Sequence, residues 1–95
     1  MVITILEARV EEKDWQTLQA TYKLMTQVVP PEIKISYLAQ DQSDNSLWRI
    51  LTIWENQEAL DAMRASGQIP TGVAIFQKVQ ATPKLTVYDI QGATG

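Results

Sequence analysis

Arg49 is the residue whose type and place most suggest chemistry, because it interrupts the apolar segment Leu47 to Trp54 (LWRILTIW). A guanidinium group does not lose its proton in a protein, so its burial in a strand requires a carboxylate partner. We expect that partner to be Glu7, with Arg9 and Glu55 as further members of the network. Two roles stay open for Arg49. It would stabilise an enolate or oxyanion, or form an ion pair that fixes strand register or a subunit interface.

Aromatic and amide side chains provide further candidates for binding a small molecule. Trp48 and Trp54 share one face of their strand, because side chains alternate along a strand. Tyr22 lies on the apolar stripe of an expected helix, and Asn56 precedes another. A structural role is open for each: core packing for the aromatic rings and helix capping for Asn56. The candidate ligand-binding residues are thus Tyr22, Trp48, Arg49, Trp54 and Asn56, and no catalytic residue is assigned.

The chain has no histidine and no cysteine. This removes disulfides, thiolate metal sites, cysteine nucleophiles and the usual general base at neutral pH. We therefore expect neither a bound metal nor a cofactor, and only carboxylates, tyrosine, lysine and arginine remain for proton transfer. The net charge is −3 and the eight lysines and arginines are scattered, so we expect no nucleic-acid partner. The acidic residues Glu11, Glu12, Asp41 and Asp44 are expected to form a solvated surface.

The length of 95 residues predicts one domain that spans residues 1–95. The apolar run from Val2 to Leu6 stops at Glu7 and lacks a basic leader, so it does not resemble a targeting segment. No apolar stretch is long enough to span a membrane. We therefore expect a cytoplasmic protein without a membrane partner.

Hydrophobic periodicity and turn residues predict four strands and three helices. The strands are expected at Val2–Val10, Ile33–Gln40, Leu47–Trp54 and Lys84–Ile90. Asp14 is expected to cap the first helix, which Pro30 and Pro31 end. Its apolar stripe is Trp15, Leu18, Tyr22 and Met25, widened by Leu24 and Val28. Asn56 and Gly67 bound the second helix, Gly72 to Gln80 is a short third one, and the tail from Gln91 to Gly95 is frayed.

The expected strands at 2–10 and 47–54 are apolar on both faces, whereas Ile33, Ile35 and Tyr37 are expected to share one face of the second strand. This pattern predicts an α+β fold of ferredoxin-like βαββαβ order, in which the first and third strands are central in a four-stranded antiparallel sheet. The helices can cover only one sheet face. Leaving the other, apolar face in water would forgo several kcal/mol at about 25 cal/mol per Å². We therefore expect a homodimer in which a second copy covers that face.

The segment from Leu51 to Ser66 (LTIWENQEALDAMRAS) resembles antibiotic biosynthesis monooxygenase-type dimeric α+β barrel proteins. In that family a strand ends in an aromatic–acidic pair, here Trp54-Glu55. A capped helix with an Ala-Leu pair follows, here Asn56 and Ala59-Leu60. The order and length of the elements from Val2 to Ile90 fit as well.

The resemblance implies a homodimer with its sheets face to face and a cavity between sheet and helices in each subunit. It also implies cofactor-independent oxidation of an aromatic or quinone-like molecule, in which an aromatic wall holds the substrate. A non-catalytic homodimer that binds a small apolar ligand, or serves as an interaction module, is the alternative. Members often carry histidine in or after the second helix, and the haem-degrading branch ligates iron through one. Met63 to Val73 contains none, so the resemblance does not extend to haem degradation.

Overall fold

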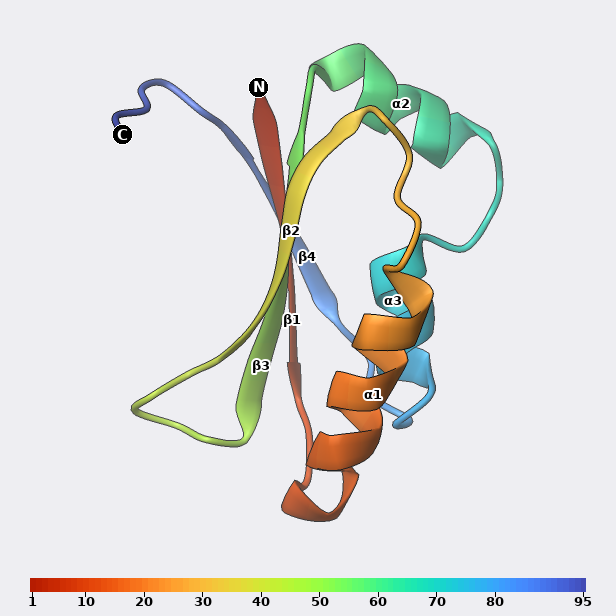
Figure 1. Ribbon diagram of the computed structural model, residues 1–95, viewed down its shortest axis with the longest axis vertical. Coiled ribbons are helices and arrows are strands. Elements are labelled where there is room, and N and C mark those ends of the chain that lie inside the picture. The colour runs from red at the N-terminus through yellow and green to blue at the C-terminus, as the bar shows by residue number, and fades with distance from the viewer.

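The computed structural model describes residues 1–95, and it confirms the expected α+β order of elements. Three helices lie on one side of a single sheet, as Figure 1 shows. None of the helices combines the length and the apolar character that a membrane crossing requires. The elements are β1 (Val2–Arg9), a 3₁₀ turn (Glu12–Asp14), α1 (Trp15–Met25), β2 (Ile33–Gln40), β3 (Leu47–Trp54), α2 (Gln57–Ala65), α3 (Thr71–Gln77) and β4 (Lys84–Asp89).

The four strands are antiparallel in the order β2-β3-β1-β4, so the doubly apolar strands β1 and β3 are central, as expected. Alternation along each strand divides its side chains between two faces. The covered face, which carries the helices, includes Leu6 and Ala8 of β1 and Trp48 and Ile50 of β3. The opposite side is the open face. On β1 and β3 it carries Ile3, Ile5, Glu7, Arg9, Leu47, Arg49, Leu51 and Ile53.

An irregularity near the start of β2 corrects one expectation about the faces. Ile33 pairs with Trp54 whereas Ile35 pairs with Ile53, and the register shifts between Ile33 and Ile35. A bulge of this kind adds one residue to a strand and therefore exchanges the faces on either side of it. Ile33 consequently packs beside Trp54 on the covered face, while Ile35 lies on the open face. The prediction that Ile33 shares a face with Ile35 was wrong.

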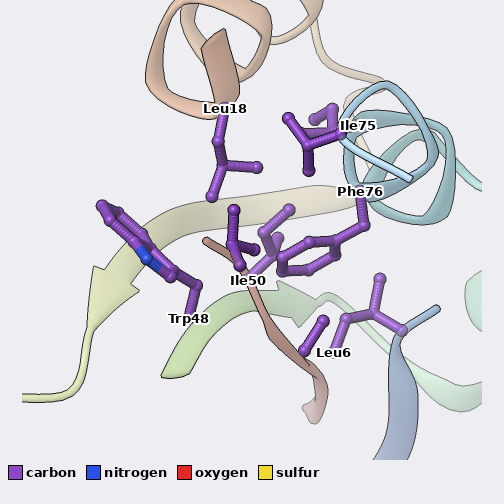
Figure 2. Packing of buried hydrophobic residues seen from close by; sticks show 9 residues of the cluster. Leu6, Leu18, Trp48, Ile50, Ile75 and Phe76 are labelled. Atoms are coloured by element: carbon purple, nitrogen blue, oxygen red, sulfur yellow. The ribbon is translucent and has the colours of Figure 1, made fainter. Parts of the chain in front are cut away.

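The core lies between the covered face and the helices α1 and α3. Leu18 of α1 and Phe76 of α3 are fully buried, and Ile75 is almost so. Figure 2 shows these side chains converging from the helices onto Leu6 and Ile50 of the sheet. The short helix expected from Gly72 to Gln80 is present as α3, Thr71–Gln77, with Phe76 buried on it and Val79 buried just beyond its end. A second, smaller cluster of Val2, Trp54 and Leu60 joins α2 to the other end of the sheet.

Helix α1 begins directly after Asp14, as expected, but it ends earlier than expected. It stops at Met25, well before the prolines, and Leu24 and Val28 are exposed rather than part of the apolar stripe. The 3₁₀ turn leads into its first residue, and the Asp14 side chain makes no capping hydrogen bond. The start of the helix is held instead by the Trp15 indole, whose Nε1 donates to the Val10 carbonyl at 2.9 Å. The expected capping role of Asp14 was therefore wrong.

Leu18 and Leu24 provide a matched test of this core, because both lie on α1 and only Leu18 is buried. We expect Leu18→Ala to lower the free energy of unfolding by about 2–5 kcal/mol, through lost burial and an unfilled cavity. Leu24→Ala should change it by less than about 0.5 kcal/mol. Urea unfolding followed by circular dichroism measures both. Equal losses in the two variants would show that α1 is docked differently.

Candidate functional site

A cavity of about 680 Å³, partly open to solvent, lies between the covered face and the helices. This volume is within the range of small-molecule sites. Of its 32 lining residues 17 are hydrophobic, which suits a largely apolar ligand. The sheet supplies its floor and all three helices supply its walls. Apolar lining residues include Leu6, Met25, Ile50, Trp54, Leu60, Met63, Val73 and Ile75.

The five candidate ligand-binding residues occupy four different environments. Tyr22 and Trp54 both line the cavity, one from α1 and the other from the end of β3. Trp48 lies in the core beside Trp15, with ring centroids 6.0 Å apart, and its buried indole N–H has no hydrogen-bond partner. Asn56 caps α2 by accepting a hydrogen bond from the Ala59 backbone N–H at 2.8 Å. Arg49 projects from the open face, away from the cavity.

Three hydroxyl side chains cross the floor of the cavity in one row. Thr52 of β3 stands directly opposite Thr4 of β1 and Ser36 of β2, and all three line the cavity. Both cavity-lining aromatic candidates bind this row. The Trp54 indole Nε1 donates to Thr4 Oγ1 at 3.0 Å, and the Tyr22 hydroxyl donates to Ser36 Oγ at 2.9 Å. We call Thr4, Thr52 and Ser36 the hydroxyl row.

The hydroxyl row was not predicted, although the sequence contains a signal for it. One threonine on each central strand interrupts an otherwise apolar series on the covered face. Their alignment becomes visible only when the register of β1, β3 and β2 is known, because a shift of one residue would turn one of them outward. The sequence alone does not supply that register.

Charged side chains are absent from the floor and occur only at the mouth of the cavity. The charged residues among those that line it are Glu32, just before β2, and Arg64, near the end of α2. Both are exposed. No group of three or more carboxylates is placed to hold a metal ion. The floor therefore offers neutral hydrogen bonds to a ligand rather than a charge.

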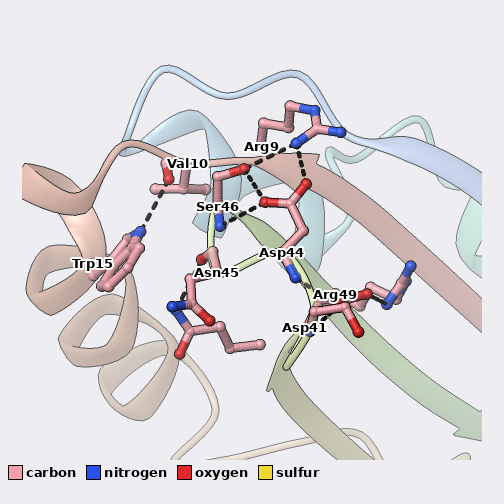
Figure 3. Close-up of polar contacts among 10 residues, drawn as sticks. Arg9, Val10, Trp15, Asp41, Asp44, Asn45, Ser46 and Arg49 are labelled. Carbon is pink, nitrogen blue, oxygen red and sulfur yellow. Dashed lines mark hydrogen bonds and ion pairs between the residues drawn. The ribbon is translucent and has the colours of Figure 1, made fainter.

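The expected Glu7–Arg49 pair is confirmed, and it belongs to a network on the open face. Arg49 Nε lies 2.8 Å from Glu7 Oε2, and its Nη1 lies 3.1 Å from Asp41 Oδ2. Arg9 pairs separately with Asp44, and Glu55 pairs with Lys34. The expectation that Arg9 and Glu55 belong to the Glu7–Arg49 network was therefore wrong. Asp41 and Asp44 were expected to be simply solvated. Figure 3 shows that both instead bind arginines and hold the hairpin turn between β2 and β3.

The hydrogen bonds in this turn stabilise the charged form of both aspartates. The Ser46 hydroxyl, followed by the Arg9 guanidinium, lowers the pKa of Asp44 from 3.8 to about 2. The pKa of Asp41 is lowered too, chiefly by the backbone N–H groups of Ser43 and Asp44 and then by Arg49. Protonation of these carboxyl groups would therefore weaken their side-chain hydrogen bonds in the turn, while the backbone bond from the Val10 N–H to the Ser46 carbonyl at 2.7 Å would remain.

The remainder of the open face is an apolar surface. Ile35, Tyr37 and Tyr88 are between 41% and 52% exposed. They flank the aliphatic side chains of the two central strands, with Tyr37 opposite Leu51 and Tyr88 opposite Ile3. A contiguous apolar surface of this kind is typical of an interaction site. We call Ile3, Ile5, Ile35, Tyr37, Leu51, Ile53 and Tyr88 the open-face cluster.

No protein-family model matches the chain, and no curated protein matches it. Solved structures do match it over nearly its full length. A protein from Deinococcus radiodurans, named as an inferred antibiotic biosynthesis monooxygenase, superposes with a TM-score of 0.69 at 18% identity, covering 100% of this chain and 97% of that one. The fold is that of the antibiotic biosynthesis monooxygenases. The resemblance seen in the sequence is confirmed at this level, and identities this low establish the fold alone.

Two further structures with the monooxygenase fold differ in what they are named for. A variant of MhuD with two manganese protoporphyrin IX molecules per active site superposes with a TM-score of 0.75 at 19% identity, covering 100% of this chain and 99% of that one. SnoaB from Streptomyces nogalater, a cofactor-independent oxygenase, superposes with a TM-score of 0.65 at 13% identity, covering 97% and 94%. Proteins with this fold are therefore named for different ligands and activities. The function of this chain has to be inferred from the residues of its cavity and not from its fold.

The lowered pKa of Asp44 predicts an acid-sensitive turn. Its folded-state pKa lies below its unfolded value, so its contribution to stability is present above about pH 4 and is lost as the pH falls towards 2. We expect Asp44→Asn to be less stable than the unaltered protein at pH 7, and to lose less stability between pH 4 and pH 2. Urea midpoints measured across this range test the difference. Parallel curves for the two proteins would contradict the assignment.

Proposed function

We propose that the protein binds an aromatic or quinone-like small molecule in the cavity and oxidises it with molecular oxygen, without a bound cofactor. The observation that carries this proposal is an apolar cavity whose floor holds only neutral hydrogen-bonding groups. Such a site retains a planar apolar ring system and orients its oxygen substituents. SnoaB, which shares the fold, is named as a cofactor-independent oxygenase.

In this reaction the substrate is the reductant. A hydroquinone gives up two electrons and its two hydroxyl protons and becomes the quinone, while molecular oxygen takes up both electrons and both protons and leaves as hydrogen peroxide. The protein contributes a largely apolar cavity, aromatic packing from Tyr22 and Trp54, and hydrogen bonds to the substrate oxygen. Hydrogen-bond donors aimed at an oxygen that gains negative charge stabilise the transition state.

Haem is a poorer match to the side chains of this cavity. Histidine and cysteine, the usual protein ligands of haem iron, are missing from the sequence. Among the lining residues the thioethers of Met25 and Met63 and the phenol of Tyr22 remain, and the phenol already donates to Ser36. The donor set does not fit a haem held by an axial imidazole or thiolate.

A non-catalytic ligand-binding protein is the second candidate. One observation favours it: the cavity floor has no carboxylate, imidazole or amine to accept a proton from the substrate, and the charged lining residues stand at the mouth. Binding without oxygen consumption would identify this function. The two candidates share the same cavity and the same ligand class.

We further propose that the protein is a homodimer in which the open-face clusters of two copies pack together. Covering these side chains removes apolar area from water on both copies at once. The open-face charges lie mainly toward one end of β1 and β3, so they border the apolar residues on that side, and polar groups at the border of an apolar patch are common in interfaces.

Oxygen consumption with a panel of hydroquinones and naphthohydroquinones tests the cavity. Uptake above the protein-free rate is expected for the unaltered protein. Ala59→Trp should abolish most of it, because Ala59 lines the cavity and a bulky ring there would fill it. Ala65→Trp is the matched control, since Ala65 is exposed on the same helix and does not line the cavity. Equal rates in both variants would place the reaction elsewhere or deny it.

Light scattering tests the dimer. We expect a particle of twice the 10.7 kDa chain mass at micromolar concentration. Ile53→Lys, which puts a charge among the side chains of the open-face cluster, should yield monomers, whereas Leu24→Lys on the exposed side of α1 should not. Circular dichroism of each variant checks that the fold persists. A 10.7 kDa particle for the unaltered protein would refute the assembly.

A further inference from the structure

The three hydroxyl groups of the hydroxyl row are neighbours that face the same cavity. Directly opposed residues of neighbouring antiparallel strands have Cβ atoms about 4.5–5.5 Å apart. Ser36, Thr52 and Thr4 therefore place three hydroxyl groups side by side across β2, β3 and β1 on the covered face. All three line the same cavity, so one ligand group can reach more than one of them.

The hydrogen bonds at the two ends of the row leave its hydrogen atoms free. An indole N–H can only donate, so Thr4 Oγ1 must be the acceptor in its bond with Trp54. A hydroxyl that accepts in this way keeps its own hydrogen for another partner. Ser36 is in the same position, because it accepts from Tyr22. The hydroxyl of Thr52, in the middle, makes no hydrogen bond to the protein.

Sheet stability alone does not account for this arrangement. Cross-strand threonine and serine pairs stabilise a sheet when their hydroxyls bond to each other. Here the row has no internal bond, and each end is bound instead by an aromatic side chain from the cavity wall. Thr4 is moreover the one polar residue among the buried residues, at 8% exposed. A buried hydroxyl hydrogen is costly unless an acceptor is supplied.

We propose that Thr4, Thr52 and Ser36 form the polar subsite of the cavity, which selects ligands that present a hydrogen-bond acceptor oxygen, such as the carbonyl of a quinone or an aromatic ketone. The subsite rests on the proposed function, because it assumes that the cavity is the ligand site. Trp54 and Tyr22 act as positioning residues here: each donates to the oxygen of a row member and so directs that member's hydrogen towards the ligand. The apolar walls strengthen these bonds by lowering the local dielectric.

Two probes of similar shape separate the subsite from the cavity itself. Naphthalene tests the apolar cavity alone, and 1,4-naphthoquinone adds two acceptor oxygens. The absence of cysteine removes thiol addition to the quinone as a complication. Binding of each probe is measured by equilibrium dialysis or by quenching of tryptophan fluorescence. We expect the unaltered protein to bind the quinone roughly ten times more tightly than naphthalene, which is the effect of about one hydrogen bond.

Nearly isosteric substitutions then assign the preference to individual hydroxyls. Thr4→Val and Thr52→Val should each weaken quinone binding by roughly five- to tenfold and leave naphthalene binding unchanged. Thr86→Val is the control, because Thr86 stands opposite Ile5 on the open face of the same sheet. It should alter neither affinity. Two substitutions in the row keep the test valid if one of them impairs folding.

Each remaining outcome has one meaning. Equal affinity for the two probes, or an equal loss of both affinities in Thr4→Val and Thr52→Val, would overturn the subsite and leave the cavity as the ligand site. Failure of both probes to bind the unaltered protein would overturn the proposed function, and the subsite with it. A loss of quinone binding in Thr86→Val as large as in Thr4→Val would also refute the subsite.

Discussion

β1 and β3 are paired so that Thr4 stands opposite Thr52 and Glu7 stands opposite Arg49. Because side chains alternate, the threonine pair faces the cavity and the ion pair faces the other way. A slip of one residue would exchange the faces of a whole strand. The ion pair on the open face therefore helps to fix the register that aligns the hydroxyl row on the covered face. The arrangement of side chains on both faces thus depends on the register between β1 and β3.

The charges of the open face take on a different meaning in a monomer and in a dimer. Arg49, Glu7 and Asp41 have side chains between 24% and 38% exposed in the single chain, where such pairs contribute little to stability. Covering them with another protein surface would remove water, and an arginine without partners would then be costly. Arg49 already holds two carboxylates. The network is therefore suited to being covered and does not require it.

The sequence was most informative where a periodic pattern dominates. The two-sided apolarity of β1 and β3 correctly predicted central strands, and the arginine at position 49 correctly pointed to Glu7. It failed where one residue changes the geometry. The bulge in β2 moved Ile33 to the covered face, and the early end of α1 left Leu24 and Val28 exposed. These features depend on tertiary contacts that a period of two or 3.6 residues does not encode.

The candidate site was harder to predict than the fold for the same reason. Tyr22 and Trp54 were named as aromatic side chains, but their partners Ser36 and Thr4 are 14 and 50 residues away along the chain. Short polar residues in apolar strands carry little meaning until the strands are aligned. An aromatic side chain can be recognised in a sequence, whereas a row of hydroxyl groups forms only when three strands pair in one register.

The buried core consists of two clusters of unequal size, one at each end of the sheet. The helix that packs on the smaller cluster is the wall of the cavity with the fewest buried contacts. Nine buried residues join α1 and α3 to one end of the sheet, while the cluster at the other end has three, of which α2 contributes Leu60 alone. Few buried apolar contacts mean a low free energy of local opening. α2 supplies Leu60 and Met63 to the cavity wall and Arg64 to its mouth. The least anchored helix is thus also a wall of the ligand site, so the energetic cost of admitting a ligand falls on the part of the core that contributes least to the fold.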